Sequence, residues 1–343
     1  MVGFKVKSDC LACRESISRR VTMNNNIISL IFDNDFKQVG DRYFLQGKEI
    51  LCSNDILRFT PNQSYSTGNF SKLREKHAQL QLDSVNGTND REFTILKRTN
   101  WPREFFKDKL ILECGCGAGA DTEALLKLGA KVVSVDIAGV DICKANMMGN
   151  PSSLVIQGSI MDLPFKKKSF DIVWCHRVLQ HTPSPNMTLD HILQFAKADG
   201  AVFVHSYSMR PQQVLSWKYV LRPLTRNMEP EKLYRLVERW TPGLFKFTNS
   251  LRAIKPDLLG RLLFAVAYQV IPVRNYRFEP KFNDKSDEFI IEYAVHDTFD
   301  CLSPRYDRPL THHEFRKIAK RHLKHKYEIV EQGCTLLRSV VKK

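Results

Sequence analysis

The chain has 343 residues and carries 52 Lys and Arg against 37 Asp and Glu, which gives a formal net charge of +15. Its length allows one full α/β domain with appendages, and a hydrophobic content of 43% is enough for a large core. No run of about 20 apolar residues occurs, and the N-terminus lacks the apolar segment of a signal peptide. The nine cysteines, an odd number, indicate free thiols in a reducing compartment. We therefore expect a cytoplasmic protein without a membrane-spanning helix.

The basic charge is concentrated in two segments. Residues 205–255 contain ten Lys and Arg against three acidic residues, and residues 311–326 contain six against one, with four histidines. Such fields favour an anionic partner, which could be nucleic acid, a phosphorylated or carboxylated substrate, or an anionic membrane surface. A solvated helix face explains them equally well.

Residues 1–60 are expected to form a small N-terminal accessory region. Cys10 and Cys13 have the spacing of one half of a zinc knuckle, but no second cysteine pair follows. A structural zinc site needs four ligands, so we expect a β-rich region without metal. The run Gly40 to Leu51 resembles a β-hairpin within it.

Residues 61–107 are expected to form a helical lead-in to the main domain. Ser71 is placed to cap a helix that runs through Leu73, His77 and Leu80. Residues 93–106 are predicted to form the next helix, interrupted by Pro102.

From residue 109 strands and helices alternate, which predicts a parallel sheet with helices on both faces. Strands are predicted at 109–114, 131–135, 153–157, 170–175 and 201–207, and helices at 120–129, 139–148 and 186–198. The pair Asp199-Gly200 is predicted to form the turn before the fifth strand.

Three alternate glycines follow the first of these strands. Gly115, Gly117 and Gly119 stand between the strand and a helical pattern, and glycine is needed where the backbone turns sharply or meets a ligand closely. The helix that follows directs its N–H groups at whatever lies over this turn. Asp136 ends the next strand, where a ribose would offer its hydroxyl groups. These features predict a nucleoside site at the carboxyl edge of the sheet.

The identity of the nucleoside depends on further motifs. Gly115-x-Gly117-x-x-Ala120 also fits the loose dinucleotide fingerprint, so an NAD-dependent dehydrogenase is an alternative. However, Glu113 precedes the glycines, and the segments 157–165 and 169–182 follow in order. Together, over about residues 108–208, these motifs resemble the class I SAM-dependent methyltransferases.

The resemblance implies an α/β, Rossmann-like fold with a mostly parallel, seven-stranded sheet whose last strand is antiparallel. The final hairpin would comprise 327–331 and 334–341, turned by Gly333. Residues 1–60 would be a degenerate form of the zinc-ribbon-like module found in some uncharacterised bacterial methyltransferases.

The resemblance also implies which residues bind S-adenosyl-L-methionine (SAM). The glycine turn would meet the methionine end with Glu113 near its ammonium group, Asp136 would bind the ribose, and Ile137 would lie under the adenine. Many class I enzymes place an acid after the third strand for the adenine amino group. Ser159 stands there instead, helped by the Ile160 backbone or replaced by Asp162 reaching back. The expected cofactor-binding residues are Glu113, Gly115, Cys116, Gly117, Gly119, Asp136, Ile137, Ser159, Ile160 and His176.

His181 follows the fourth strand, at the edge where an acceptor would meet the methyl group. Because histidine titrates near neutrality, His181 is the candidate general base, although it could instead only shape its loop beside Thr182-Pro183. Strand ends and the lid segment ahead of the sheet supply the candidate substrate contacts Tyr65, Arg177, His205 and Tyr207. No residues are assigned to a metal.

About a hundred residues separate the fifth strand from the final hairpin. Leu233, Leu236, Val237 and Trp240 have helical spacing, and 257–270 is predicted to be a second, largely apolar helix. This insertion would lie beside the methyl donor, where a substrate lid belongs. The expected domains are 1–60, accessory; 61–107, lead-in and lid; 108–208, SAM-binding core; 209–300, helical insertion; and 301–343, a C-terminal helix with the final hairpin.

The sequence thus predicts a SAM-dependent methyltransferase acting on an O or N atom of a small or glycan-linked, anionic or neutral substrate. RNA methylation is an alternative that rests on the basic charge alone. A non-catalytic SAM-binding scaffold or sensor is another, suggested by Ser159 at the adenine position.

Overall fold

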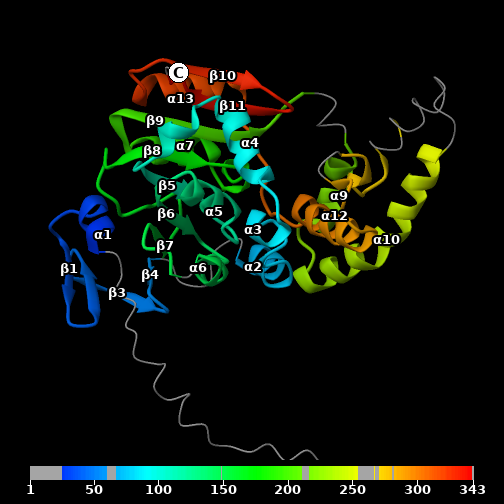
Figure 1. Cartoon of the computed structure of the whole chain (residues 1–343), viewed down its shortest axis with the longest axis horizontal. Coiled ribbons are helices and arrows are strands. Elements are labelled where there is room, and N and C mark those ends of the chain that lie inside the picture. Colours follow the sequence, from blue (N-terminus) through cyan, green and yellow to red (C-terminus); the bar gives the residue numbers. More distant parts are fainter. Residues whose placement is uncertain are drawn as a thin grey trace, which may run out of the picture.

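A sheet of eleven strands runs through the part of the chain that the computed structural model describes, namely residues 25–59, 67–147, 149–210, 216–253, 266, 270–279 and 282–341 (Figure 1). Its strand order is β1-β2-β3-β4-β7-β6-β5-β8-β9-β11-β10. The sheet is therefore larger than the seven strands predicted from the sequence.

Five parallel strands form the centre of the sheet. They are β5 (Leu110–Cys114), β6 (Lys131–Asp136), β7 (Ser153–Gln157), β8 (Phe170–Cys175) and β9 (Ala196–Tyr207). All five residues of β5 are buried, as expected for a strand covered on both faces. β11 (Cys334–Ser339) runs antiparallel between β9 and β10 (Tyr327–Glu331). This arrangement confirms the predicted strands and the antiparallel last strand.

One predicted turn is wrong. Asp199-Gly200 lies inside β9, which begins at Ala196, and the preceding helix α7 (Pro185–Leu193) ends earlier than predicted. The pairing of β8 with β9 shifts register between Phe170 and Ile172, so the irregularity is a bulge within the strand. A Cβ on Gly200 would lie 2.9 Å from the Lys197 nitrogen and 3.0 Å from the Asp171 carbonyl, which explains the glycine.

Four further strands extend the sheet beyond β7. β1 (Phe36–Val39), β2 (Arg42–Leu45), β3 (Lys48–Ser53) and β4 (Ile56–Arg58) form an antiparallel meander, and β4 pairs in parallel with β7. The predicted hairpin is confirmed as β2–β3, turned at Gln46-Gly47, both with positive φ. The zinc-ribbon character of this region is not shown, and Cys10 and Cys13 lie outside the described residues.

Helices cover both faces of the sheet. Side chains of α4 (Asp90–Thr99), the short turn η3 (Arg103–Phe106) and α5 (Ala120–Lys127) pack on one face, and α6 (Val140–Asn146) packs beside them. On the other face, α1 (Asn25–Ile31), α7 and α13 (His312–His322) share one core cluster. The predicted interruption at Pro102 is confirmed, since α4 ends before it and η3 begins after it.

A second helical layer stands beside the carboxyl edge of the sheet. It contains α9 (Trp217–Thr225), α10 (Pro230–Ala253) and α12 (Asp287–Leu302). Leu73 of α2 (Thr67–Lys76) is buried in the same cluster as Leu233 and Phe299, so α2 joins this layer (Figure 1). α3 (Asp83–Asn86), η4 (Leu179–His181) and η5 (Tyr276–Phe278) are single turns. Ser71 lies inside α2 and does not cap it.

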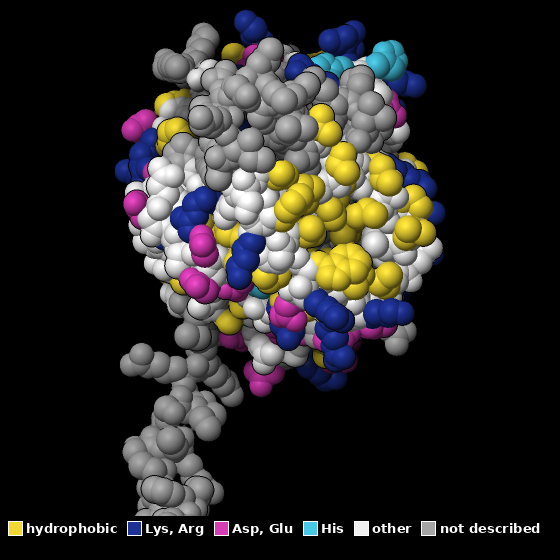
Figure 2. All heavy atoms as spheres, turned by 90° about the vertical axis from the view of Figure 1, so that its right-hand side faces the viewer, with side chains coloured by type: hydrophobic (Ala, Val, Ile, Leu, Met, Phe, Trp, Pro, Cys, Tyr) yellow, Lys and Arg dark blue, Asp and Glu magenta, His cyan; other side chains and the backbone are white. Residues whose placement is uncertain are grey.

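The outer surface of this layer carries exposed apolar side chains. Leu233 and Val237 of α10 are buried, but Trp240 is 54% exposed. Hydrophobic side chains gather on the face shown in Figure 2. The predicted helix at 257–270 lies outside the described residues apart from Val266 and Val270. Among the helices of the described part, none is long and apolar enough to cross a membrane.

Candidate active site

The glycine turn after β5 is held by backbone hydrogen bonds. The N–H groups of Gly115 and Cys116 donate to the carbonyl of Val135 on β6, at 2.7 and 3.2 Å. Gly115, Gly117 and Gly119 have φ of 87°, 56° and 95°, which side-chain-bearing residues adopt at a cost. A Cβ on Gly115 would also lie 2.3 Å from Val178 Cγ2. The turn therefore needs glycine for both its conformation and its packing.

Asp136, at the end of β6, faces this turn. Its Oδ2 accepts a hydrogen bond from the Gly117 N–H at 2.8 Å, and its Oδ1 accepts from the Ile137 N–H at 2.7 Å. Burial raises the pKa of Asp136, while these backbone donors act in the opposite direction. The carboxylate is thus fixed by the backbone with its side chain lining a cavity.

Glu113 lies one strand away, at the end of β5, and is 2% exposed. The hydroxyl groups of Thr122 and Ser134 donate to its Oε2 at 2.6 and 2.8 Å. Burial nevertheless raises the pKa of Glu113 to about 8. The side chain is therefore mostly protonated at neutral pH.

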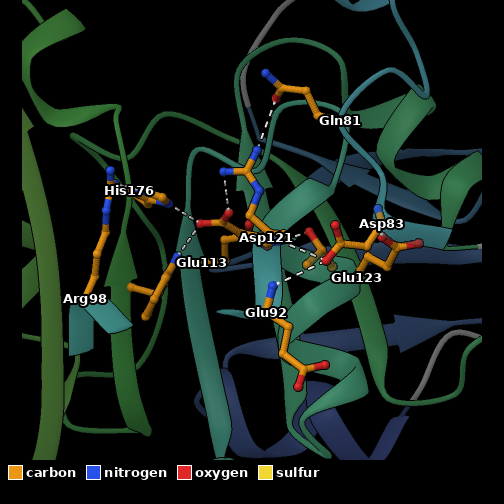
Figure 3. Close-up of polar contacts among 11 residues, drawn as sticks. Gln81, Asp83, Glu92, Arg98, Glu113, Asp121, Glu123 and His176 are labelled. Atoms are coloured by element: carbon orange, nitrogen blue, oxygen red, sulfur yellow. Dashed lines mark hydrogen bonds and ion pairs between the residues drawn. The ribbon is translucent and has the colours of Figure 1, made fainter. Parts of the chain in front are cut away.

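A polar network lies beneath the turn (Figure 3). Asp121 Oδ2 accepts from Trp174 Nε1 at 2.8 Å and from His176 Nδ1 at 2.6 Å, and its Oδ1 lies 3.3 Å from Arg91 Nη1. Burial opposes ionisation, but the contacts with His176 and Arg91 hold the pKa of Asp121 below its usual range. Asp121 is thus a buried carboxylate with a partner on each oxygen.

The same network determines the tautomer of His176. Arg98 Nη1 lies 2.6 Å from His176 Nε2, and because a guanidinium can only donate, Nε2 accepts while Nδ1 carries the proton. Burial lowers the pKa of His176 to about 4, so the ring is neutral at pH 7. With both ring nitrogens engaged, His176 is not available as a general base.

One cavity joins the sheet edge to the helical layer, with about 1140 Å³ of space free of protein atoms, part of it open to solvent. The sheet edge contributes Glu113, Gly115, Cys116, Asp136, Ile137 and Ile160. The helices contribute Arg74, Arg91, His296, Asp297 and Asp300. His176, Arg177 and His181, which follow β8, also line the cavity.

Comparisons with known proteins agree with this geometry. A family model described as a methyltransferase domain matches residues 112–204, the glycine turn and the strands that follow it. The ubiquinone biosynthesis O-methyltransferase of Hahella chejuensis is 23% identical over 198 residues, which cover 55% of this chain and 75% of that protein. Residues 112–204 of the chain therefore form a methyltransferase domain of the SAM-dependent kind.

Two further comparisons cover less of the related protein or have lower sequence identity. The ubiquinone biosynthesis O-methyltransferase of Xanthomonas oryzae pv. oryzae is 30% identical over 125 residues, which cover 34% of this chain and 52% of that protein. The chain thus spans about half of the length of that relative. The magnesium protoporphyrin IX methyltransferase of Synechocystis PCC 6803, solved with bound SAH, matches with a TM-score of 0.38 and 14% identity, covering 79% of this chain and 85% of that one.

SAM is accordingly the cofactor of this methyltransferase, and the dehydrogenase alternative is wrong. The cavity offers groups that suit SAM. Arg74 lies over the glycine turn, its Nε 2.7 Å from where a Cβ of Gly117 would be. That Nε is buried without a hydrogen-bond partner in the described part of the chain, as a donor awaiting the methionine carboxylate would be. Asp136 and Ile137 are close by on the same wall.

Some of the expected cofactor contacts do not reach the cavity. Gly117, Gly119 and Ser159 are not among the residues that line it, although Gly158 and Ile160 are. The Ser159 hydroxyl accepts the Met161 N–H at 3.3 Å within its own turn. An adenine contact at this position would therefore come from the backbone or from Ile160.

His181 lines the same cavity as the glycine turn. Its Nδ1 lies 3.0 Å from the carbonyl oxygen of Tyr306, and its Nε2 lies 3.4 Å from the Tyr207 hydroxyl. Since a carbonyl only accepts, the proton is on Nδ1 and the lone pair is on Nε2. Burial lowers the pKa of His181, although Asp307 and Asp300 act in the opposite direction.

The four candidate substrate residues are divided. Arg177 lines the cavity. His205 is 3% exposed and packs on His176 with ring centroids 5.0 Å apart, and Tyr207 contacts His181 and Lys218. Neither His205 nor Tyr207 is among the residues that line the cavity, and Tyr65 lies outside the described residues.

Sequence reasoning missed the residues that the helices bring to the cavity. Arg74 comes from α2, Arg91 from α4, and His296, Asp297 and Asp300 come from α12. The only available signal was the spacing of the last three, which places Asp300 one helical turn after His296.

Proposed function

We propose that this methyltransferase transfers the methyl group of SAM to a hydroxyl oxygen of a small molecule, with His181 as the general base. The observation that carries the proposal is the tautomer of His181, which lines the cavity: its Nδ1–H donates to the Tyr306 carbonyl at 3.0 Å, and Nε2 keeps its basic lone pair at the long distance of 3.4 Å from the Tyr207 hydroxyl. The relatives named as O-methyltransferases support an oxygen acceptor.

The sheet edge, together with Arg74 of α2, would hold the cofactor. Asp136 is placed for the ribose hydroxyls, Arg74 for the methionine carboxylate and Glu113 for the ammonium group. When bound, SAM supplies a methyl group on a positively charged sulfur, which needs no further activation. The protein must therefore position the acceptor and remove its proton.

His181 would remove that proton. Because burial keeps the ring neutral at pH 7, Nε2 can accept the hydroxyl proton as the acceptor oxygen becomes nucleophilic. The Nδ1–H bond to the Tyr306 carbonyl keeps the ring oriented through this transfer. Asp300 and Asp307 stabilise the imidazolium that forms, and it later returns the proton to solvent.

His181→Asn and His181→Ala test this role. The Asn side chain can place an N–H donor near the Tyr306 carbonyl and so keep the loop, but it cannot accept a proton as imidazole does. SAH formation would be measured with a panel of hydroxylated aromatic compounds, and a drop of about 10²- to 10⁴-fold in kcat is expected for both variants. SAM affinity, measured by calorimetry, should stay within about twofold of wild type.

If His181 only shapes its loop, His181→Asn will keep most of the activity while His181→Ala loses it. A second readout is the pH profile: kcat/KM should rise through a pKa below 6.5 and then level off, and this limb should vanish in His181→Asn. Copurifying RNA, with binding that falls steeply as salt rises, would instead support the RNA alternative.

A further inference from the structure

A second cavity adjoins the main one, and Gln81, Arg91 and Arg177 line both. It has about 550 Å³ of space free of protein atoms, part of it open to solvent. One wall is polar, with Asn86, Thr88 and Thr94 from α3, α4 and the segment between them. The aromatic residues Phe282, Phe289 and Tyr293 also line it.

Arg177 stands at the junction of the two cavities and is unusual in two ways. Its φ is +64°, a left-handed conformation that costs a non-glycine residue about 1 kcal/mol or more. In the described part of the chain its guanidinium group has no hydrogen bond and no ion pair within 4 Å. Arg177 is an exposed residue, so its guanidinium group is a cation that a ligand in either cavity can reach.

The carboxylates near Arg177 already have other partners. Asp121 is engaged by His176, Trp174 and Arg91, as described above. Asp297 lies 3.7 Å from Arg274. Neither forms an ion pair with Arg177, although the negative charges of both act to raise the pKa of its guanidinium group.

In the second cavity too, the carboxylates have other partners, whereas the cation Lys285 does not have a carboxylate partner among the described residues. Asp83 accepts from the Thr88 hydroxyl and from two backbone N–H groups, and Asp90 lies in the first turn of α4, where the helix dipole favours it. Lys285 Nζ donates to the Asn86 carbonyl at 2.9 Å and lies 5.5 Å from the centre of the Phe289 ring. Its partners are thus a neutral carbonyl and an aromatic ring, so Lys285 is a second cation on the wall of this cavity.

His296 adds an unused polar group in the main cavity. It is 4% exposed, and its Nδ1 has no hydrogen-bond partner among the described residues. Buried polar groups normally have partners, so an unpartnered nitrogen in a cavity wall points to a ligand.

We propose that the second cavity recognises the methyl acceptor and that the acceptor carries a carboxylate or phosphate group bound by Arg177. The aromatic residues of this cavity would cover the apolar part of such a molecule, and Lys285 would add a second positive charge. The planar fork of arginine suits either anion, since it can donate two parallel hydrogen bonds. This inference rests on the proposed function, because it takes the main cavity as the place of methyl transfer.

Binding to the SAH-loaded protein tests the inference without requiring turnover. The probes are 4-hydroxybenzoate and phenyl phosphate, compared with the neutral 4-hydroxybenzyl alcohol, in calorimetric or ligand-observed NMR titrations. We expect each anion to bind wild type about tenfold or more tightly than the alcohol. Arg177→Gln should abolish this preference, Arg177→Lys should keep part of it, and the surface variant Arg235→Gln should leave it unchanged.

Three outcomes would overturn the inference. One is the absence of any preference for the anions in wild type, and another is a preference that persists in Arg177→Gln. The third is a loss of SAM affinity in Arg177→Gln as large as the loss of anion affinity, which would assign Arg177 to the methionine carboxylate. With SAM in place of SAH, Arg177-dependent binding of 4-hydroxybenzoate that gives no methylated product would leave anion recognition standing and count against O-methylation of this compound.

Discussion

The two halves of the cavity are built in different ways. At the sheet edge, the site is held mainly by backbone hydrogen bonds. N–H groups of the glycine turn donate to the Val135 carbonyl and to the Asp136 carboxylate. On the helical side, single side chains such as His296 and Asp300 of α12 reach in, and Arg74 of α2 reaches over the glycine turn from an element far away in the sequence. The difference shows that the binding site of a cofactor shared by many enzymes can be predicted from local sequence motifs. The binding site of the methyl acceptor, which differs between enzymes, depends on tertiary packing.

Among changes at the sheet edge of the cavity, a substitution of Gly115 should have the largest effect. In Gly115→Ala the new Cβ meets Val178 at 2.3 Å and the residue keeps a positive φ, so we expect about 3 kcal/mol or more of lost stability and no measurable SAM binding. Denaturant unfolding and calorimetry would measure both.

Gly87→Ala is the matched control, since Gly87 has φ +65° but no atom near its Cβ position. It should cost only about 1 kcal/mol, from conformation alone. Adding Val178→Ala to Gly115→Ala should recover part of the loss. No recovery would mean that conformation rather than packing decides the position.

Acid should weaken the network beneath the turn. The pKa of His176 is about 4 in the folded chain against about 6.5 when unfolded, so the unfolded state binds more protons between these pH values. Stability therefore falls as pH drops from 6.5 to 4, by about 3 kcal/mol from this residue.

Unfolding curves measured across that pH range should show that the free energy of unfolding changes less steeply with pH in His176→Gln than in wild type. Other buried histidines, His205 and His296, have pKa values well below the usual one and add to the slope in both proteins. Identical slopes would show that His176 does not titrate separately.

Asp136→Asn should weaken SAM binding by about 2 kcal/mol, or about 30-fold, because the amide offers one acceptor oxygen in place of two. Asp300→Asn is the control on the helical side and should change SAM affinity much less. Calorimetry on both variants would decide. Equal losses would contradict the division of the cavity into a cofactor half and an acceptor half.

SAM binding should release a proton from Glu113. With a pKa of about 8 the side chain is protonated at pH 7, and a nearby ammonium group would lower that pKa. Affinity should then rise with pH below 8, by at most about 1.4 kcal/mol per unit. Titrations in buffers of different ionisation enthalpy would count the protons, and Glu113→Gln should release none.

The sheet edge was predictable because its signals are local. A strand, alternate glycines and a second strand ending in Asp136 specify both the turn and the carboxylate, whatever the rest of the chain does. The position of His181 in the cavity wall was predictable for the same reason, as it follows β8 by a few residues.

The helical side lacked such signals. Arg74 and His296 meet in the cavity only because α2, α10 and α12 pack together, and no spacing in the sequence shows that contact. Ser71 shows the limit of local reasoning in the other direction: a good capping residue lies inside α2 because tertiary packing determines where that helix begins.

The pairing of β4 with β7 also protects the molecule from unwanted association. Without β4, the carboxyl end of β7 would present unpaired N–H and C=O groups next to the cofactor crevice, and such open edges recruit other strands. Arg58 secures the cover, through Gln157 Oε1 at 2.9 Å and Asp141 Oδ1 at 2.7 Å. A shortened chain that begins after Arg58 would expose the unpaired backbone of β7 and should aggregate more readily. Work on the isolated catalytic core should therefore keep strands β1 to β4.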